Sequence, residues 1–224
     1  METNVPETFP FAPKGVIFDC DGVMIDSRSA NIGYYNLLLK ILGKPPLTKE
    51  QEDYAQMATA RQAVEQVMTE DELARLPDIC ARYPYKENTL PTLRLEPYFA
   101  EFARWLKGQG VRLAVHTNRG GGVWDVLDHF GISGLFDIVM NVQLARPKPD
   151  PDGVDRIVWE WGLKPEEICF VGDSDTDMGA ANGAGVPFVA YKNPRLAAVW
   201  HTGSFLELKE SLKGYFAGHG GAQA

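Results

Sequence analysis

Two aspartates separated by one residue, Asp19 and Asp21, follow a short apolar run at residues 15–18. Such a run is too short for a helix and is typical of a buried strand. Because residues two apart in an extended chain point the same way, the two carboxyl groups can act at one point. One carboxylate can attack a phosphorus atom, while its neighbour donates and then accepts the proton that hydrolysis requires. The pair therefore suits displacement at a phosphate ester.

Later segments supply the other groups that this chemistry needs. Each follows an apolar run, and together they are Thr117, Asn118, Lys148, Asp173 and Asp177. A phosphate dianion repels an approaching carboxylate, so Mg²⁺ held by Asp19 and Asp173 would neutralise it. Lys148 would offset the crowded negative charge, and Thr117 with nearby backbone N–H groups would hold phosphate oxygens.

The elements that must position these residues alternate along the chain. Apolar runs predict strands at residues 15–18, 111–115, 136–140, 167–171 and 186–190, and amphipathic segments predict helices at 99–107, 120–130, 151–161 and 176–184. This order indicates a doubly wound, Rossmann-like α/β fold with a parallel sheet covered on both faces. Ligands bind beyond the carboxyl ends of the strands in such a sheet, which is where the polar residues above occur.

Residues 26–95 have a different hydrophobic pattern, because their apolar residues recur at helical spacing and no convincing strand is visible. Asp26 or Ser27 could cap the first helix, and Thr48 with Gln51 resembles a capping box for the second. We expect an all-helical cap at 26–95, inserted into an α/β core formed by residues 1–25 and 96–224.

The composition excludes several classes of protein. A net charge of −8 argues against non-specific binding to nucleic acid. Three widely spaced cysteines form neither a metal-binding nor a disulfide pattern, which indicates a reducing compartment. No apolar run approaches the ~20 residues that cross a membrane, and the N-terminal residues lack the apolar segment of a signal peptide. We expect a cytoplasmic monomer or homodimer whose partner is a small phosphorylated metabolite.

Taken together, the four sets of residues resemble the motifs of the haloacid dehalogenase (HAD) superfamily phosphatases. The first is Asp19-x-Asp21-Gly22-Val23, the second Thr117-Asn118, the third Lys148-Pro149, and the fourth Gly172-Asp173-Ser174-x-x-Asp177. They occur in order across essentially the whole predicted core. The helical insertion after the first motif is similar to the cap of the phosphoglycolate phosphatase and β-phosphoglucomutase branch.

That resemblance implies a role for each acid. Asp19 would be the nucleophile and a metal ligand, and would carry an aspartyl-phosphate. Asp21 would be the general acid and base, while its backbone carbonyl binds Mg²⁺. Asp173 would bind the metal directly, and Asp177 would support the metal shell through water or Lys148.

The resemblance also implies how phosphate is held. Thr117 and the catalytic Lys148 would bind it, and Asn118 has a weaker claim. Specificity should lie in the cap, where Arg61 could bind a substrate carboxylate or a second phosphate, although a surface position is equally compatible. For Arg119, which follows Asn118, the sequence does not decide between a functional and a surface position.

The default substrate is phosphoglycolate or a similar metabolite. One alternative is a phosphomutase of the same branch, which would return the phosphate of Asp19 to a sugar instead of to water. A dehalogenase is disfavoured, because its reaction would not use Asp21 or the acids expected to bind a metal ion. A different class of protein, a non-catalytic phospho-accepting module, would not need every chemical position to be filled.

Overall fold

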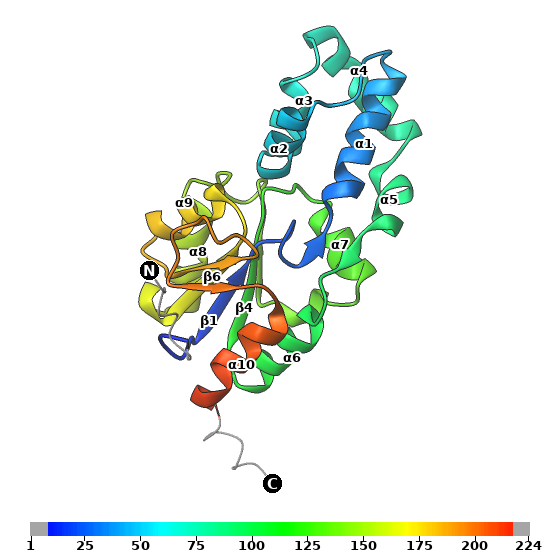
Figure 1. The fold of residues 1–224 in the computed structure, drawn as a ribbon. Coiled ribbons are helices and arrows are strands. Elements are labelled where there is room, and N and C mark those ends of the chain that lie inside the picture. Colours follow the sequence, from blue (N-terminus) through cyan, green and yellow to red (C-terminus); the bar gives the residue numbers. More distant parts are fainter. Residues whose placement is uncertain (1–8, 217–224) are drawn as a thin grey trace.

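The computed structural model describes residues 9–216. Its centre is a sheet of six parallel strands in the order β5–β4–β1–β6–β7–β8 (Figure 1). The strands are β1 (Gly15–Phe18), β4 (Arg112–His116), β5 (Ile138–Met140), β6 (Ile168–Gly172), β7 (Phe188–Tyr191) and β8 (Trp200–Thr202). The predicted doubly wound, Rossmann-like α/β fold is thereby confirmed.

Helices cover both faces of the sheet, as the alternation of side chains along β1 requires. Val16 and Phe18 pack against α6 (Phe99–Gly108), α7 (Val123–His129) and α10 (Phe205–Phe216). Ile17 points to the opposite face and packs against α8 (Asp152–Trp161) and α9 (Asp175–Gly183). Burial of both faces of β1 fixes its carboxyl end, which directly precedes Asp19.

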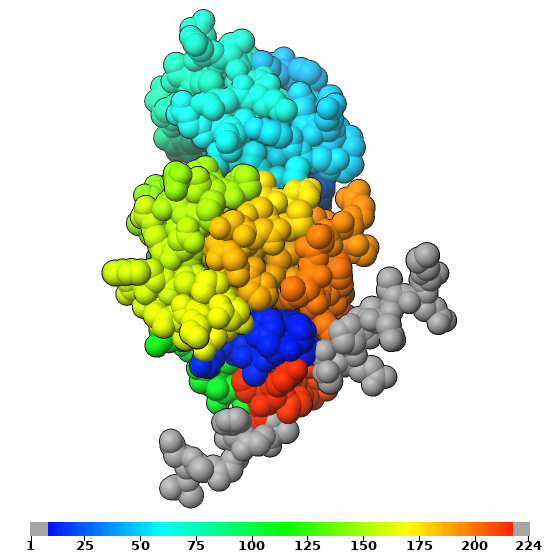
Figure 2. All heavy atoms as spheres, turned by 90° about the vertical axis from the view of Figure 1, so that its left-hand side faces the viewer, coloured from blue at the N-terminus to red at the C-terminus, as the bar shows by residue number. Residues whose placement is uncertain are grey.

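Five helices form the cap above the carboxyl ends of the strands (Figure 1). They are α1 (Arg28–Ile41), α2 (Lys49–Met57), α3 (Ala60–Glu65), α4 (Glu70–Arg82) and α5 (Tyr85–Asn88). The cap has a small apolar core of its own, which includes Leu38, Leu39, Val64 and Ile79. Figure 2 shows it as a separate block of atoms resting on the core.

The cap joins the core through a two-stranded antiparallel ladder, in which β2 (Ile25–Asp26) pairs with β3 (Arg94–Leu95). The expectation that residues 26–95 contain no strand is therefore wrong, because a two-residue strand is too short to produce a periodic pattern. The capping box of Thr48 and Gln51 is confirmed. Ser27 is the N-cap residue of α1, but its hydroxyl donates to Asp21 instead of capping the helix.

Three short 3₁₀ helices complete the described chain: η1 (Leu90–Thr92), η2 (Ser133–Leu135) and η3 (Pro165–Glu167). The sequence did not predict β8 or α10. Within residues 9–216, no helix combines the length and apolarity that crossing a bilayer requires. The N-terminal residues on which the absence of a signal peptide was argued lie outside the described range.

Candidate active site

A tight turn after β1 places the two sequence-predicted acids. The backbone N–H of Asp19 donates to the carbonyl of Val171 at 3.0 Å, which ties Asp19 to the end of β6. Cys20 is fully buried among core side chains, as expected for a small apolar residue. Gly22 has φ +81°, and a Cβ atom there would lie 2.2 Å from Oδ2 of Asp173. Only glycine therefore fits both the backbone and the neighbouring carboxylate at this position.

Three acids converge beside this turn, one directly after β1, one directly after β6 and one in the first turn of α9. Asp19, Asp173 and Asp177 each offer a carboxylate oxygen, and these atoms lie within 4.8 Å of one another. Burial and the charge of Asp177 raise the pKa of Asp19 well above its usual range. The same two causes raise the pKa of Asp173 to about 7. Because clustered buried carboxylates resist ionisation unless a cation compensates them, this donor set fits a hard divalent metal ion.

Lys148 is the buried cation of this cluster. Its Nζ donates to Oδ1 of Asp19 at 2.6 Å, to Oδ1 of Asp177 at 2.5 Å and to the carbonyl of His116 at 3.1 Å. Burial acts to lower the pKa of Lys148, but Asp177 and Asp19 together raise it above its usual value. Lys148 is therefore held charged beside Asp19.

Both carboxylate oxygens of Asp177 already have partners. Oδ1 accepts from Lys148, and Oδ2 accepts from the backbone N–H groups of Asp173 at 3.2 Å and Ser174 at 3.1 Å. The hydroxyl of Ser174 also donates to Oδ2, at 2.6 Å. Asp177 thus connects Lys148 to the first turn of α9, which agrees with the indirect support expected of it.

The segment after β4 also contacts Lys148. Thr117 is almost completely buried, and its Oγ1 accepts from the backbone N–H of Arg119 at 3.1 Å. Asn118 bonds to Lys148 twice: its Oδ1 accepts from the Lys148 N–H at 2.8 Å, and its Nδ2 donates to the Lys148 carbonyl at 3.2 Å. Its Nδ2 also donates to the carbonyl of Met57 in the cap at 3.1 Å. Asn118 therefore holds the Lys148 backbone, and its phosphate contact stays a prediction.

The side chain of Asp21 makes a two-point ion pair with Arg119. Nε of Arg119 donates to Oδ2 at 2.5 Å, and Nη2 donates to Oδ1 at 2.6 Å. Asn31 of α1 also donates to Oδ1, at 3.0 Å. Burial acts to raise the pKa of Asp21, but the charge of Arg119 and these hydrogen bonds lower it overall. The sequence left Arg119 undecided; its one signal was a position two residues beyond Thr117, shortly after β4, which is adjacent to β1.

Arg61, for which the sequence left a substrate contact and a surface position equally open, is not brought to the site. Its side chain is 83% exposed and pairs with Glu65 at 2.6 Å, one helical turn later. Ala63 and Val64 of the same helix are buried, so their packing in the cap turns Arg61 toward solvent. The structure does not support a contact between Arg61 and substrate.

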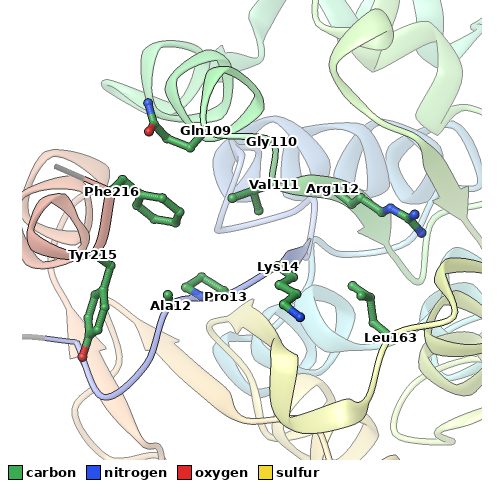
Figure 3. Close-up of a pocket in the computed structure, with 10 residues that line it drawn as sticks. All are labelled: Ala12, Pro13, Lys14, Gln109, Gly110, Val111, Arg112, Leu163, Tyr215 and Phe216. Carbon is green, nitrogen blue, oxygen red and sulfur yellow. The ribbon is translucent and has the colours of Figure 1, made fainter. Parts of the chain in front are cut away.

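A cavity of about 820 Å³ lies between the cap and the core, and it is lined by Asp19, Asp21, Thr117, Asn118, Lys148 and Asp173 but not by the buried Asp177. Cap residues that line it include Asn31, Tyr34, Tyr35, Met57 and Tyr85. A second cavity, of about 380 Å³, lies at the opposite end of the sheet, and Lys14, Arg112 and Phe216 are among its lining residues (Figure 3). None of the predicted site residues lines this second cavity, so the site lies beneath the cap.

Comparison with known proteins assigns the family. The family model for haloacid dehalogenase-like hydrolases matches residues 16–191. The chain therefore belongs to the haloacid dehalogenase-like hydrolase family and is an enzyme, which confirms the resemblance drawn from the four motifs.

Its relatives lie on the phosphatase branch that the sequence predicted. Phosphoglycolate phosphatase of Pseudomonas putida is 32% identical over 187 residues, covering 79% of this chain and 68% of that protein. Phosphoglycolate phosphatase of Haemophilus influenzae is 35% identical over 194 residues, covering 79% of this chain and 84% of that protein. The crystal structure of a HAD-superfamily hydrolase, subfamily IA, variant 1, from Geobacter sulfurreducens PCA has a TM-score of 0.75 and 36% identity over 88% of this chain and 98% of that chain.

Proposed function

We propose that the chain hydrolyses a small phosphate monoester in a Mg²⁺-dependent reaction through an aspartyl-phosphate on Asp19. One observation carries the proposal: Asp19 lies within one buried cluster with Lys148, Asp173 and Asp177, at the carboxyl ends of neighbouring strands. A nucleophile, a fixed cation and a donor set for a divalent metal thus meet at a single point.

The carboxylates of Asp19 and Asp173, with the backbone carbonyl of Asp21, would hold Mg²⁺. When bound, the ion supplies positive charge that neutralises the phosphate and lowers its repulsion from Asp19. Lys148, whose Nζ donates to Oδ1 of Asp19 at 2.6 Å, supplies a second positive charge. The hydroxyl of Thr117 accepts only a backbone N–H, so its own proton is available to a phosphate oxygen.

The reaction then needs two proton transfers, and we assign both to Asp21, which must enter the first of them protonated. As Asp19 attacks phosphorus, the bond from phosphorus to the ester oxygen breaks, and Asp21 protonates the leaving oxygen. Asp21 next removes a proton from the attacking water, and hydrolysis of the aspartyl-phosphate restores Asp19 and releases inorganic phosphate. To perform these transfers, Asp21 must turn from Arg119 toward the reacting oxygen.

The names of the relatives support phosphoglycolate, or a metabolite of the same kind, as the substrate. A phosphomutase of the β-phosphoglucomutase type is the alternative enzyme. A non-catalytic phospho-accepting module is the alternative of another class. We further propose the division into a core of residues 1–25 and 96–224 and a cap of residues 26–95, which the β2–β3 ladder supports. The cytoplasmic location and the monomeric or homodimeric state stay predictions.

The test is phosphate release from 2-phosphoglycolate and p-nitrophenyl phosphate, with Mg²⁺ and after its removal by chelation. We expect Mg²⁺-dependent release by the wild type and none by Asp19→Asn, whose circular dichroism spectrum and unfolding temperature should remain close to wild type. Asp175→Asn, which changes an exposed acid of α9, is the matched control and should retain turnover. No release by the wild type with any divalent metal would refute the enzyme proposal. Turnover by Asp19→Asn would remove Asp19 as nucleophile, and isomerisation of a sugar phosphate without phosphate release would favour the phosphomutase.

A further inference from the structure

Arg119 joins the core to the cap beside the proposed acid and base. Besides its two bonds to Asp21, its Nη1 and Nη2 both donate to the hydroxyl of Tyr85 at 3.2 Å, and Nη2 donates to Oδ1 of Asn31 at 3.4 Å. The Arg119 Cζ atom also lies 5.5 Å from the centre of the Tyr85 ring. The guanidinium is thus enclosed by one core residue and two cap residues, and its side chain is only 13% exposed.

The hydrogen-bonding capacity of Arg119 exceeds what these neighbours can accept. A guanidinium has five N–H groups, and Asp21 takes two of them in short, charge-assisted bonds. The other three face only the Tyr85 hydroxyl and Asn31 Oδ1, at distances of 3.2–3.4 Å. Tyr85 itself donates to Asn31 Oδ1 at 2.7 Å, so one acceptor is already shared. One N–H of Nη1 therefore has no acceptor among the described residues, and Arg119 lines the main cavity.

The position of Asp21 determines which part of a substrate lies next to the Arg119 guanidinium. Asp21 must lie beside the ester oxygen to protonate it, with the phosphate on the side of Asp19. The remainder of the leaving alcohol then extends away from phosphorus, into the part of the cavity that Arg119, Tyr85 and Asn31 line. When Asp21 turns to the ester oxygen, Arg119 loses its anionic partner, and a largely buried guanidinium without an anion is unfavourable.

We propose that Arg119, held by Tyr85 and Asn31, binds a carboxylate on the leaving alcohol. The enzyme would thereby select phosphorylated hydroxy acids over phosphate esters of uncharged alcohols of the same size. The inference rests on the proposed phosphatase function, since it assigns the substrate side of that site. The Nε–Nη2 edge that Asp21 vacates matches a planar carboxylate in two-point geometry, so the substrate carboxylate would replace that of Asp21 as counter-ion.

The test compares two substrates of similar size, 2-phosphoglycolate and 2-hydroxyethyl phosphate, of which only the first carries a carboxylate. The quantity measured is the ratio of their kcat/KM values, because a change that merely misplaces Asp21 affects both substrates alike. We expect the wild type to favour 2-phosphoglycolate by about 10- to 100-fold, the range typical of a hydrogen bond to a charged group. Arg119→Met should reduce the ratio to near unity. Arg119→Lys, which keeps the charge but cannot make the two-point hydrogen bonds of a guanidinium, should give an intermediate ratio.

Lys86→Met is the matched control, since Lys86 is another cation on the cavity wall but pairs with Asp125 at 2.6 Å. Its ratio should equal that of the wild type. An equal loss of preference in Lys86→Met would assign the selectivity to the general charge of the cavity and overturn the inference. A preference for 2-phosphoglycolate that survives Arg119→Met, or a wild type without preference, would overturn it while leaving the phosphatase function intact. Absence of phosphate release from both substrates would refute the proposed function instead.

Discussion

Replacing Gly22 by alanine tests whether the turn after β1 positions the acids proposed to bind the metal ion. Two effects are expected, and they can be separated. Alanine at φ +81° carries a backbone cost of about 1 kcal/mol. Independently, its Cβ atom would lie 2.2 Å from Oδ2 of Asp173, whereas ordinary contacts begin near 3.4 Å, so the carboxylate must move by about 1 Å. A misplacement of that size in a reacting site lowers turnover by about 100-fold.

Gly110→Ala provides the matched control. Gly110 has φ +78°, but nothing lies within 4 Å of the Cβ position. Its variant should therefore show the backbone cost alone, and both proteins should lose about 1 kcal/mol of unfolding free energy in urea denaturation. Only Gly22→Ala should also lose turnover and require more Mg²⁺ for half-maximal phosphate release. If its turnover and Mg²⁺ requirement match those of Gly110→Ala, then the approach of Asp173 to the turn does not position that acid, and the reasoning fails.

The remaining predictions concern the balance of charge in the acid cluster. Lys148→Met removes the buried cation that bonds Asp19 and Asp177, so at neutral pH the metal-free protein should lose about 3–5 kcal/mol of unfolding free energy, measured in urea. A loss no larger than the one caused by replacing an exposed lysine with methionine would contradict this prediction. The raised pKa values of Asp19 and Asp173 mean that the native state holds protons that the unfolded chain releases. The metal-free protein should therefore become less stable as the pH rises from about 4 to about 7, and Mg²⁺ affinity should increase over the same range, by up to about tenfold per pH unit for each proton displaced. Thermal unfolding with and without Mg²⁺ across this pH range measures both trends, and Mg²⁺ binding that is tighter at pH 5 than at pH 8 would refute the assignment.

The acid cluster was predictable because it follows from sheet geometry. Asp19, Thr117 and Asp173 each come directly after a buried strand, and β1 pairs with both β4 and β6. Parallel pairing brings their carboxyl ends to one edge, so spacing along the chain was enough to group the residues. Lys148 lies eight residues beyond β5, in a loop, and only its place in the motif order associated it with the others.

The cap side of the site was not predictable, because helical phase decides it. Arg61 lay near the expected position but points outward, since its helix buries Ala63 and Val64 instead. Asn31 and Tyr85 carry no motif, and only the docking of α1 and α5 over Arg119 brings them to the cavity. β8 was missed because a three-residue strand produces little hydrophobic periodicity. α10 did carry a signal, since Phe205, Leu208 and Leu212 recur at helical spacing and are buried.

The β2–β3 ladder has a consequence for how such enzymes diversify. The chain leaves the core at Ile25–Asp26 and returns at Arg94–Leu95, and these two segments are hydrogen-bonded neighbours. The distance that the insertion must span is therefore fixed and very short, whatever the number of residues between its ends. Helices can be lengthened, deleted or exchanged between families at this junction without altering the register of the central sheet. Recombination here would change which alcohols are accepted while preserving the machinery that breaks the phosphate ester.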